Sequence, residues 1–307
     1  MTANTHSLPP GAALATAILC VLFGANAVAI KLSLTGLGTF TCAALRFAMA
    51  AVIVAVWART TGRRLSIKAG YRGHLWIISA GFTLQLALFY LGVSRTDASR
   101  ATLVANLQPF FILFLAHKFI PDDRITPRKM GGILLGFSGV CLVFMENSGL
   151  ASMPRTGDAI VLAAAFIWAC NAVYVKRVID HFSAFQLVLF PMLFSVPVFA
   201  GLGLLLDRPM IGHISPAVTG SMLYQGLVTA SFGFVAWNHL LGKYGAVALH
   251  SFIFIMPISG VVLGSLVLGE PISGKLAGAM GLITTGIVVV HWRRKRIVPA
   301  TPFGRNI

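Results

Sequence analysis

The chain is a succession of mostly apolar runs joined by short connections. A helix that crosses the hydrocarbon core of a bilayer, about 30 Å thick, needs about 20 consecutive apolar residues. Ten runs meet this requirement, and they occupy residues 12–33, 38–58, 75–93, 98–118, 130–146, 158–177, 183–206, 217–241, 246–268 and 275–292. The prediction is an all-α membrane protein with ten transmembrane helices.

The composition supports this fold class and excludes others. Hydrophobic residues make up 57% of the chain and charged residues 10%, whereas soluble domains carry about 25% charged residues. The net charge of +16 does not indicate a nucleic-acid partner, because the cations lie in short segments between apolar runs. We therefore expect a lipid bilayer as the surrounding partner and no nucleic acid.

The cations also predict the orientation in the membrane, since cytoplasmic loops are enriched in Lys and Arg. With a cytoplasmic N-terminus, 17 of the 24 Lys and Arg residues lie on the cytoplasmic side and five on the other, while Lys31 and Arg46 lie within spans. Both termini are therefore expected in the cytoplasm. The first ten residues lack the basic region of a cleaved signal peptide, so the first helix is expected to be retained.

A short motif occurs twice, as Asn-Ala-Val-Ala-Ile-Lys at residues 26–31 and Asn-Ala-Val-Tyr-Val-Lys at residues 171–176. The offset of 145 residues is close to half of the chain, and Pro109 and Pro257 recur at an offset of 148. Each half holds five spans, and because five is odd, the second half must enter the membrane from the opposite side. Inverted repeats of this kind are typical of transporters. The predicted repeats cover residues 12–146 and 158–292.

The motifs in both halves resemble those of the EamA-type drug/metabolite transporters. They are Leu45-Arg46-Phe47, Gln108-Pro109-Phe110, Leu268-Gly269-Glu270-Pro271-Ile272 and the doubled Asn motif. The first half departs from the family pattern at Asp122-Asp123, where Gly-Glu is usual. Arg46 has no counterpart in the second half, where Pro191 stands at the aligned position. The resemblance implies ten helices around a central cavity, a bacterial-type plasma (inner) membrane, and export of metabolites, amino acids or drugs. It leaves the substrate open, because one fold carries many substrates.

Two asparagines lie near the middle of their predicted spans, Asn26 and Asn171, each three residues after an aromatic side chain, Phe23 or Trp168. Residues at this spacing share a helix face. Each Asn either bonds a neighbouring helix as a structural contact or contacts substrate. Trp168 either stacks on an apolar or aromatic substrate or packs in the core.

The recurring prolines, Pro109 and Pro257, lie at the centres of predicted spans four and nine. Proline cannot donate to the carbonyl of residue i−4, so we expect kinks at a substrate region or gate, with simple packing kinks as the alternative. Further polar side chains of these and the third span are candidates for the lining of a substrate path. They are Gln85, Tyr90, Asn106, His250 and Ser251.

Arg46 is the most unusual residue, a cation eight or nine residues into the second span. A lipid-facing arginine at this depth costs about 2.5–3.5 kcal/mol on an insertion scale. No carboxylate lies at comparable depth in any predicted span. Arg46 therefore either snorkels or bonds backbone carbonyls, or it meets the carboxylate of a substrate.

The predicted function is a secondary transporter that exports small metabolites, most closely amino acids or related compounds, by alternating access. The alternatives are a multidrug or dye efflux carrier and, more distantly, a membrane-embedded enzyme or scaffold; the sequence lacks HExxH and CxxC motifs and a buried acid–base pair. All eight acidic residues lie in loops or at span ends, which favours facilitated export over proton coupling. We expect a small-molecule substrate, no cofactor, no metal, and a monomer.

Overall fold

The computed structural model describes residues 9–63, 65–119, 127–145, 156–244 and 252–291. Within these segments the regular elements are helices, and extended pairing is limited to one isolated bridge between Leu37 and Ile211. The all-α prediction is confirmed. The helices, in chain order, are α1 (Pro10–Gly24), α2 (Asn26–Ser33), α3 (Thr39–Thr60), η1 (Ala69–Tyr71), α4 (Arg72–Ser94), α5 (Ala98–Ala105), α6 (Gln108–Phe119), α7 (Pro127–Met145), α8 (Thr156–Val178), η2 (Ile179–His181), α9 (Ala184–Leu206), α10 (Pro216–Leu223), η3 (Tyr224–Gly233), α11 (Phe234–Tyr244), α13 (Ile255–Leu268) and α14 (Gly274–His291).

Six helical segments are long and apolar enough to cross a membrane. They are Pro10–Ser33, Thr39–Thr60, Arg72–Ser94, Ala98–Phe119, Thr156–Val178 and Ala184–Leu206, and they match predicted spans one to four, six and seven. Shorter apolar helices, Met130–Val143, Ile255–Leu268 and Gly274–Val289, overlap predicted spans five, nine and ten. In predicted span eight the π-helix η3 separates α10 from α11.

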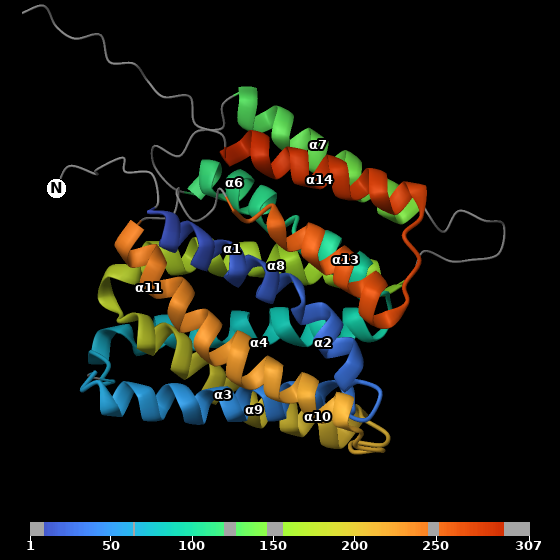
Figure 1. The fold of residues 1–307 in the computed structure, drawn as a ribbon. Helices are drawn as coiled ribbons and strands as arrows, with labels where there is room; N and C mark the ends of the chain where they lie inside the picture. The colour runs from blue at the N-terminus through green and yellow to red at the C-terminus, as the bar shows by residue number, and fades with distance from the viewer. Residues whose placement is uncertain (1–8, 64, 120–126, 146–155, 245–251, 292–307) are drawn as a thin grey trace, which may run out of the picture.

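The helices pack in pairs that join distant parts of the chain. α3 packs on α9, α7 on α14, α5 on α13, and α4 on α8, while α1 contacts η3 and α11. Figure 1 shows α7 and α14 together along one edge of the bundle and α3 and α9 along the opposite edge. Small residues permit the close approach of α13 to α5, since a Cβ on Gly260 would lie 2.2 Å from Thr102 Cγ2.

Two span-length segments are irregular near their middle. Ala25 separates α1 from α2, and Asn106 and Leu107 form a turn between α5 and α6. The predicted kink at Pro109 therefore lies just before the proline, which is buried in the first turn of α6. Interrupted helices at membrane depth are a feature of substrate sites in transporters.

Proline alone does not determine where a helix breaks in this bundle. α9 continues without interruption through Pro191 and Pro197, although each proline removes one backbone donor. α13 begins directly after the turn at residues 252–254, and its third residue, Pro257, is buried. His250 and Ser251 lie outside the described residues.

Acidic side chains cap helix N-termini from distant parts of the chain. Asp207 Oδ2, after α9, accepts hydrogen bonds from Phe40 N (2.9 Å) and Thr41 N (2.7 Å) at the start of α3. Glu270 accepts from Ala98 N (2.6 Å) and Ser99 N (2.8 Å) at the start of α5. Both carboxylates satisfy backbone donors that lack a helical partner and complement the helix dipole.

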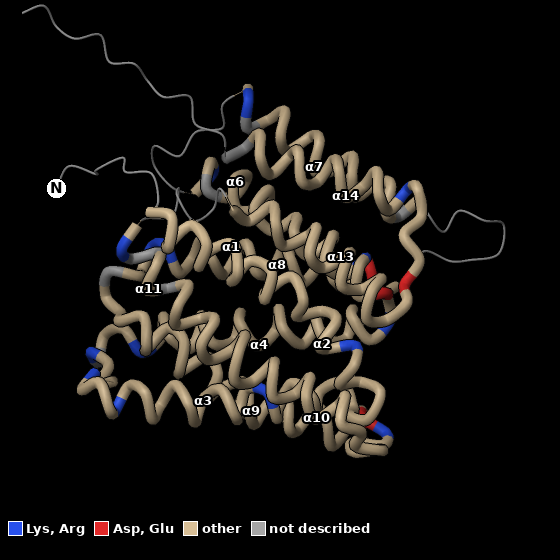
Figure 2. Tube along the Cα trace, in the orientation of Figure 1, with Lys and Arg blue, Asp and Glu red and all other residues tan. Residues whose placement is uncertain are grey.

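These caps explain why acidic residues occur at span ends. In Figure 2 the residues coloured red as Asp and Glu lie at one end of the bundle, whereas Lys and Arg occur at both ends. We call the end that carries Asp97, Asp158, Asp207 and Glu270 the acidic end.

Candidate functional site

Arg46 lies in the interior of the bundle, and its side chain is only 4% exposed. Its Nη1 donates to Tyr90 Oη and its Nη2 to Thr229 Oγ1, both at 3.2 Å. The predicted alternative in which Arg46 snorkels or bonds backbone carbonyls is therefore wrong. Side-chain hydroxyls of α4 and η3 hold the guanidinium inside the protein.

These hydroxyls belong to a larger polar cluster. Tyr90 Oη donates to Gln225 Oε1 at 2.9 Å, and Gln225 Nε2 donates to Ser33 Oγ at 2.7 Å. Thr229 Oγ1 lies 3.2 Å from Asn26 Oδ1, which places the first Asn of the doubled motif in contact with Arg46's partner. We call this set of side chains, from α2, α3, α4, α10 and η3, the Arg46 network. Its members are Asn26, Ser33, Arg46, Tyr90, Ser221, Gln225 and Thr229.

The π-helix η3 supplies two members of the network, Gln225 and Thr229. π-Helical turns are rare and frequently mark functional sites. Sequence reasoning missed both residues, although a signal was available. Ser221, Gln225 and Thr229 recur at every fourth position of an apolar run, and this spacing places polar side chains on one helix face.

The charge of Arg46 has no counter-charge among the described residues. Its Nε makes no hydrogen bond although it is buried, and the recorded partners of the other guanidinium nitrogens are neutral. The Phe47 ring, whose centroid is 5.1 Å from Cζ, adds a cation–π contact. A buried cation without a charged partner is costly, and a guanidinium fork is suited to a carboxylate. The network can therefore bind an anionic group.

Three other predicted residues lie on α4 and α8 instead, and Asn171 contacts α4. The side chain of Asn171 lies against Gly81, where a Cβ would be 3.0 Å from Asn171 Oδ1, and Gly92 faces Val161 in the same way. The two helices are thus antiparallel, and this register places Gln85 at the level of Trp168. Gln85 is 5% exposed and its Oε1 makes no hydrogen bond in the described structure, whereas Trp168 is 41% exposed.

The predicted site residues thus form two groups that α4 connects. Tyr90 faces the Arg46 network, and Gln85, five residues earlier on α4, belongs to the α8 side. Asn106 belongs to neither group: its Nδ2 donates to Thr102 O at 2.8 Å, in the turn between α5 and α6.

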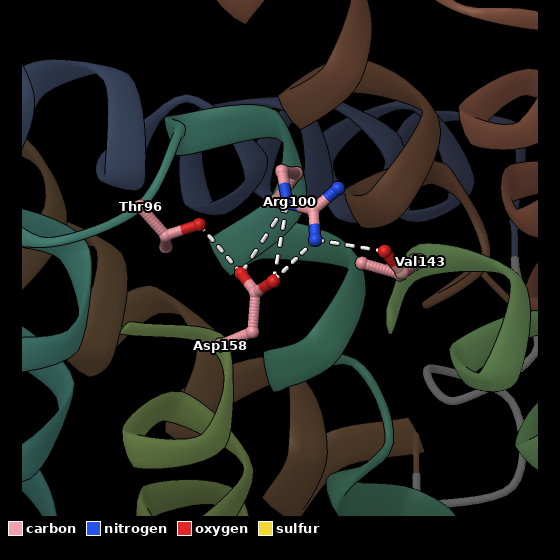
Figure 3. A network of polar contacts seen from close by, with 4 residues as sticks. All are labelled: Thr96, Arg100, Val143 and Asp158. Carbon is pink, nitrogen blue, oxygen red and sulfur yellow. Dashed lines mark hydrogen bonds and ion pairs between the residues drawn. The ribbon is translucent and has the colours of Figure 1, made fainter. Parts of the chain in front are cut away.

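A second buried arginine was not recognised in the sequence. Arg100 and Asp158 form an ion pair in which the side chains are 3% and 0% exposed, and Figure 3 shows how their groups converge. Arg100 Nη2 also donates to Val143 O (2.7 Å), and Thr96 Oγ1 donates to Asp158 Oδ1 (2.5 Å). Arg100 lies inside predicted span 98–118, and this position was the available signal. It was missed because Arg100 was counted among the cations of the loops.

Comparison with known proteins connects this geometry to a family. A model of the EamA-like transporter family matches residues 10–145 and again residues 155–292. Two bacterial proteins named "Probable amino-acid metabolite efflux pump" are each 27% identical to this chain. The one from Salmonella typhimurium aligns over 89% of this chain and 92% of its own length, and the one from Escherichia coli over 90% and 95%.

A third relative and a solved structure extend this result. A "Probable terminal-alkyne amino-acid exporter" of Streptantibioticus cattleyicolor is 24% identical, over 90% of this chain and 92% of its own length. One crystal structure superposes with a TM-score of 0.69 at 20% identity, covering 91% of this chain and 98% of that chain, so the fold is shared. Because the family model matches both halves, this protein is a member of the EamA-like transporter family.

Proposed function

We propose that this protein exports small metabolites that carry a carboxylate, most closely amino acids, along a path that passes Arg46. The observation that carries the proposal is the buried guanidinium whose recorded hydrogen-bond partners are neutral hydroxyls and whose Nε has no partner among the described residues. A substrate carboxylate would supply the missing counter-charge. The names of the efflux pumps and of the exporter described above support this substrate class.

The transport mechanism in this proposal is alternating access between two inverted five-helix repeats, residues 12–146 and 158–292. The two separate matches to the family model support the repeats. The helix pairing supports their symmetry. The first Asn of the doubled motif, Asn26 in span one, contacts η3 of span eight, and the second, Asn171 in span six, contacts α4 of span three. Exchanging the two halves of the chain converts one of these contacts into the other. In transporters with inverted repeats, rocking of the two halves opens the substrate site to one side of the membrane and then to the other.

In the proposed orientation both termini are cytoplasmic, the acidic end faces outward, and the protein is a monomer in a bacterial inner membrane. The excess of Lys and Arg in the segments assigned to the cytoplasm supports this orientation.

Export without proton coupling is part of the proposal. Asp158 is paired with Arg100, and Asp207 and Glu270 cap helices, so these carboxylates already have partners at the acidic end. A proton-coupled carrier needs a titratable group that substrate and proton share at membrane depth. Efflux rates that do not respond to a pH gradient imposed across proteoliposomes would support this; a strong response would contradict it.

The test of the function is efflux from proteoliposomes preloaded with amino acids, with their amine-free 2-hydroxy acids, and with cationic dyes. We expect carboxylate compounds to leave faster than from protein-free vesicles, and Arg46→Gln to abolish most of this difference. The exposed ring of Trp168 on α8 favours dyes as the second candidate. Dye efflux without amino-acid efflux would replace the first candidate by the second.

A further inference from the structure

A separate cavity of about 560 Å³ opens at the acidic end of the bundle. Its wall consists of the end of α2, the turn at residues 34–39, the end of α4, and the segment that follows α9. Lys31, the last residue of the first copy of the doubled motif, lines this cavity together with Asp207 and Arg208. The Arg46 network does not account for any of these three charged residues.

The three charges match the two ends of a zwitterion. Lys31 is half-buried and Arg208 is exposed, and the ion pair recorded among the described residues involves neither of them. Asp207 receives its recorded hydrogen bonds, from Phe40 N, Thr41 N and Thr41 Oγ1, on Oδ2. Its Oδ1 is thus left for an ammonium group, while the two cations suit a carboxylate.

The cavity adjoins the Arg46 network along three helices. Ser33 of the network is two residues from Lys31 on α2. Ser94, which lines the cavity, is four residues from Tyr90 on α4, and Thr39 is seven residues from Arg46 on α3. At about 1.5 Å of helix rise per residue, these residues of the cavity wall lie about 3–10 Å along the helix axes from members of the network. This placement puts the cavity between the Arg46 network and the acidic end of the bundle.

We propose that the cavity is a relay site for α-amino acids, in which Lys31 and Arg208 receive the carboxylate and Asp207 Oδ1 receives the ammonium group. The relay rests on the proposed function, since it takes its ligand from the path past Arg46. It adds a second and weaker site on one side of the membrane, because partly exposed charges bind less strongly than buried ones.

The test measures exchange of a labelled amino acid in right-side-out and in everted membrane vesicles from cells that express the full chain. The double variant Lys31→Gln/Arg208→Gln should raise the half-saturating concentration about tenfold when substrate is offered at the acidic end. Offered at the opposite end, substrate should saturate as in the wild type. Arg95→Gln is the matched control, because Arg95 is an exposed cation at the same end that does not line the cavity.

A second variant tests the ammonium contact. Asp207→Asn keeps an acceptor oxygen for the cap of α3 but removes the charge. It should weaken exchange of the amino acid several-fold and leave the matching 2-hydroxy acid unaffected. Equal weakening of both compounds would indicate a structural defect and would overturn the role of Asp207.

The outcomes separate the relay from the proposed function. If wild-type vesicles exchange no carboxylate compound, the proposed function fails. The relay is overturned and the function stands if wild-type vesicles exchange these compounds but the double variant has the same half-saturating concentration as Arg95→Gln. The same conclusion follows if the double variant raises the half-saturating concentration on both sides of the membrane. A phospholipid phosphate is, like the carboxylate, an oxyanion that Lys31 and Arg208 could bind. An effect of the double variant in proteoliposomes that requires phosphatidylglycerol and is absent in pure phosphatidylcholine would assign the cavity to lipid and also overturn the relay.

Discussion

Arg46 and Arg100 are both buried cations, 4% and 3% exposed, yet their surroundings differ. Arg100 meets the carboxylate of Asp158 and a backbone carbonyl, so its charge is neutralised within the protein. The recorded partners of Arg46 are hydroxyls and an aromatic face. Fixed pairing serves the fold, because the two charges always compensate each other. In the proposed function, the guanidinium of Arg46 is left without a counter-charge because a substrate carboxylate supplies it during transport.

The largest expected effect comes from breaking the fixed pair. Asp158→Asn leaves the Arg100 charge buried and uncompensated, and losing one partner of a buried pair costs about 3–5 kcal/mol. We expect a large fall in melting temperature in detergent. The double variant Arg100→Met/Asp158→Leu should recover much of the loss because no buried charge remains. An unchanged melting temperature for Asp158→Asn would remove the distinction between the two arginines.

Arg46→Gln should have the opposite profile, with a small change in melting temperature and a large change in transport. A hydrogen bond to a charged group contributes about 1.5–3 kcal/mol, so efflux of carboxylate substrates should fall about 10- to 100-fold. Cationic dyes should be unaffected. Arg46→Lys is the matched control: it keeps the charge but loses the fork and should fall in between. Equal loss for carboxylates and cations would assign Arg46 a folding role.

Arg46 could be found in the sequence, whereas its hydrogen bonds to Tyr90 and Thr229 could not. An arginine in an apolar run is visible locally because the membrane makes every such residue costly. Tyr90 and Thr229 reach it from α4 and η3, 44 and 183 residues away along the chain. Which helix faces meet depends on tertiary packing, and hydropathy carries no information about it.

The same limit explains the other differences. Kinks were predicted at Pro109 and Pro257, but proline alone is not a sufficient signal: α9 contains Pro191 and Pro197 without a break, while Ala25 interrupts the first span. Asp158 was correctly placed at a span end, but its burial depends on the packing of α8 against α5. The number and type of the apolar runs follow from local composition, whereas helix breaks and polar contacts follow from the neighbouring helices.

A smaller effect is expected when the support of Arg46 is weakened. Tyr90→Phe removes the hydroxyl that accepts from the charged Arg46 and donates to Gln225. Arg46 keeps its bond to Thr229, so we expect the loss in substrate binding to be about 1 kcal/mol, the net size of a typical hydrogen bond. We expect the half-saturating concentration for amino-acid efflux to rise about fivefold. Tyr71→Phe is the control, since Tyr71 stacks on His181 away from the network. A shift no larger than that of the control would show that Arg46 keeps its position without Tyr90.

The smallest expected effect concerns two buried glutamines. It tests whether a buried polar group without a partner serves the substrate, and a fully bonded one serves the fold, as proposed for the two arginines. Gln85 and Gln225 are both buried, but Gln225 bonds Tyr90, Ser33 and the carbonyl of Ala29, whereas Gln85 Oε1 has no partner among the described residues. Gln225→Leu leaves buried partners unsatisfied and should lower the melting temperature. Gln85→Leu should leave the melting temperature nearly unchanged, because Oε1 has no recorded hydrogen-bond partner that would lose its bond. The same substitution should slow amino-acid efflux a few-fold. If Gln85→Leu lowers stability as much as Gln225→Leu does, Gln85 has a structural role, and its unpaired Oε1 does not indicate contact with substrate.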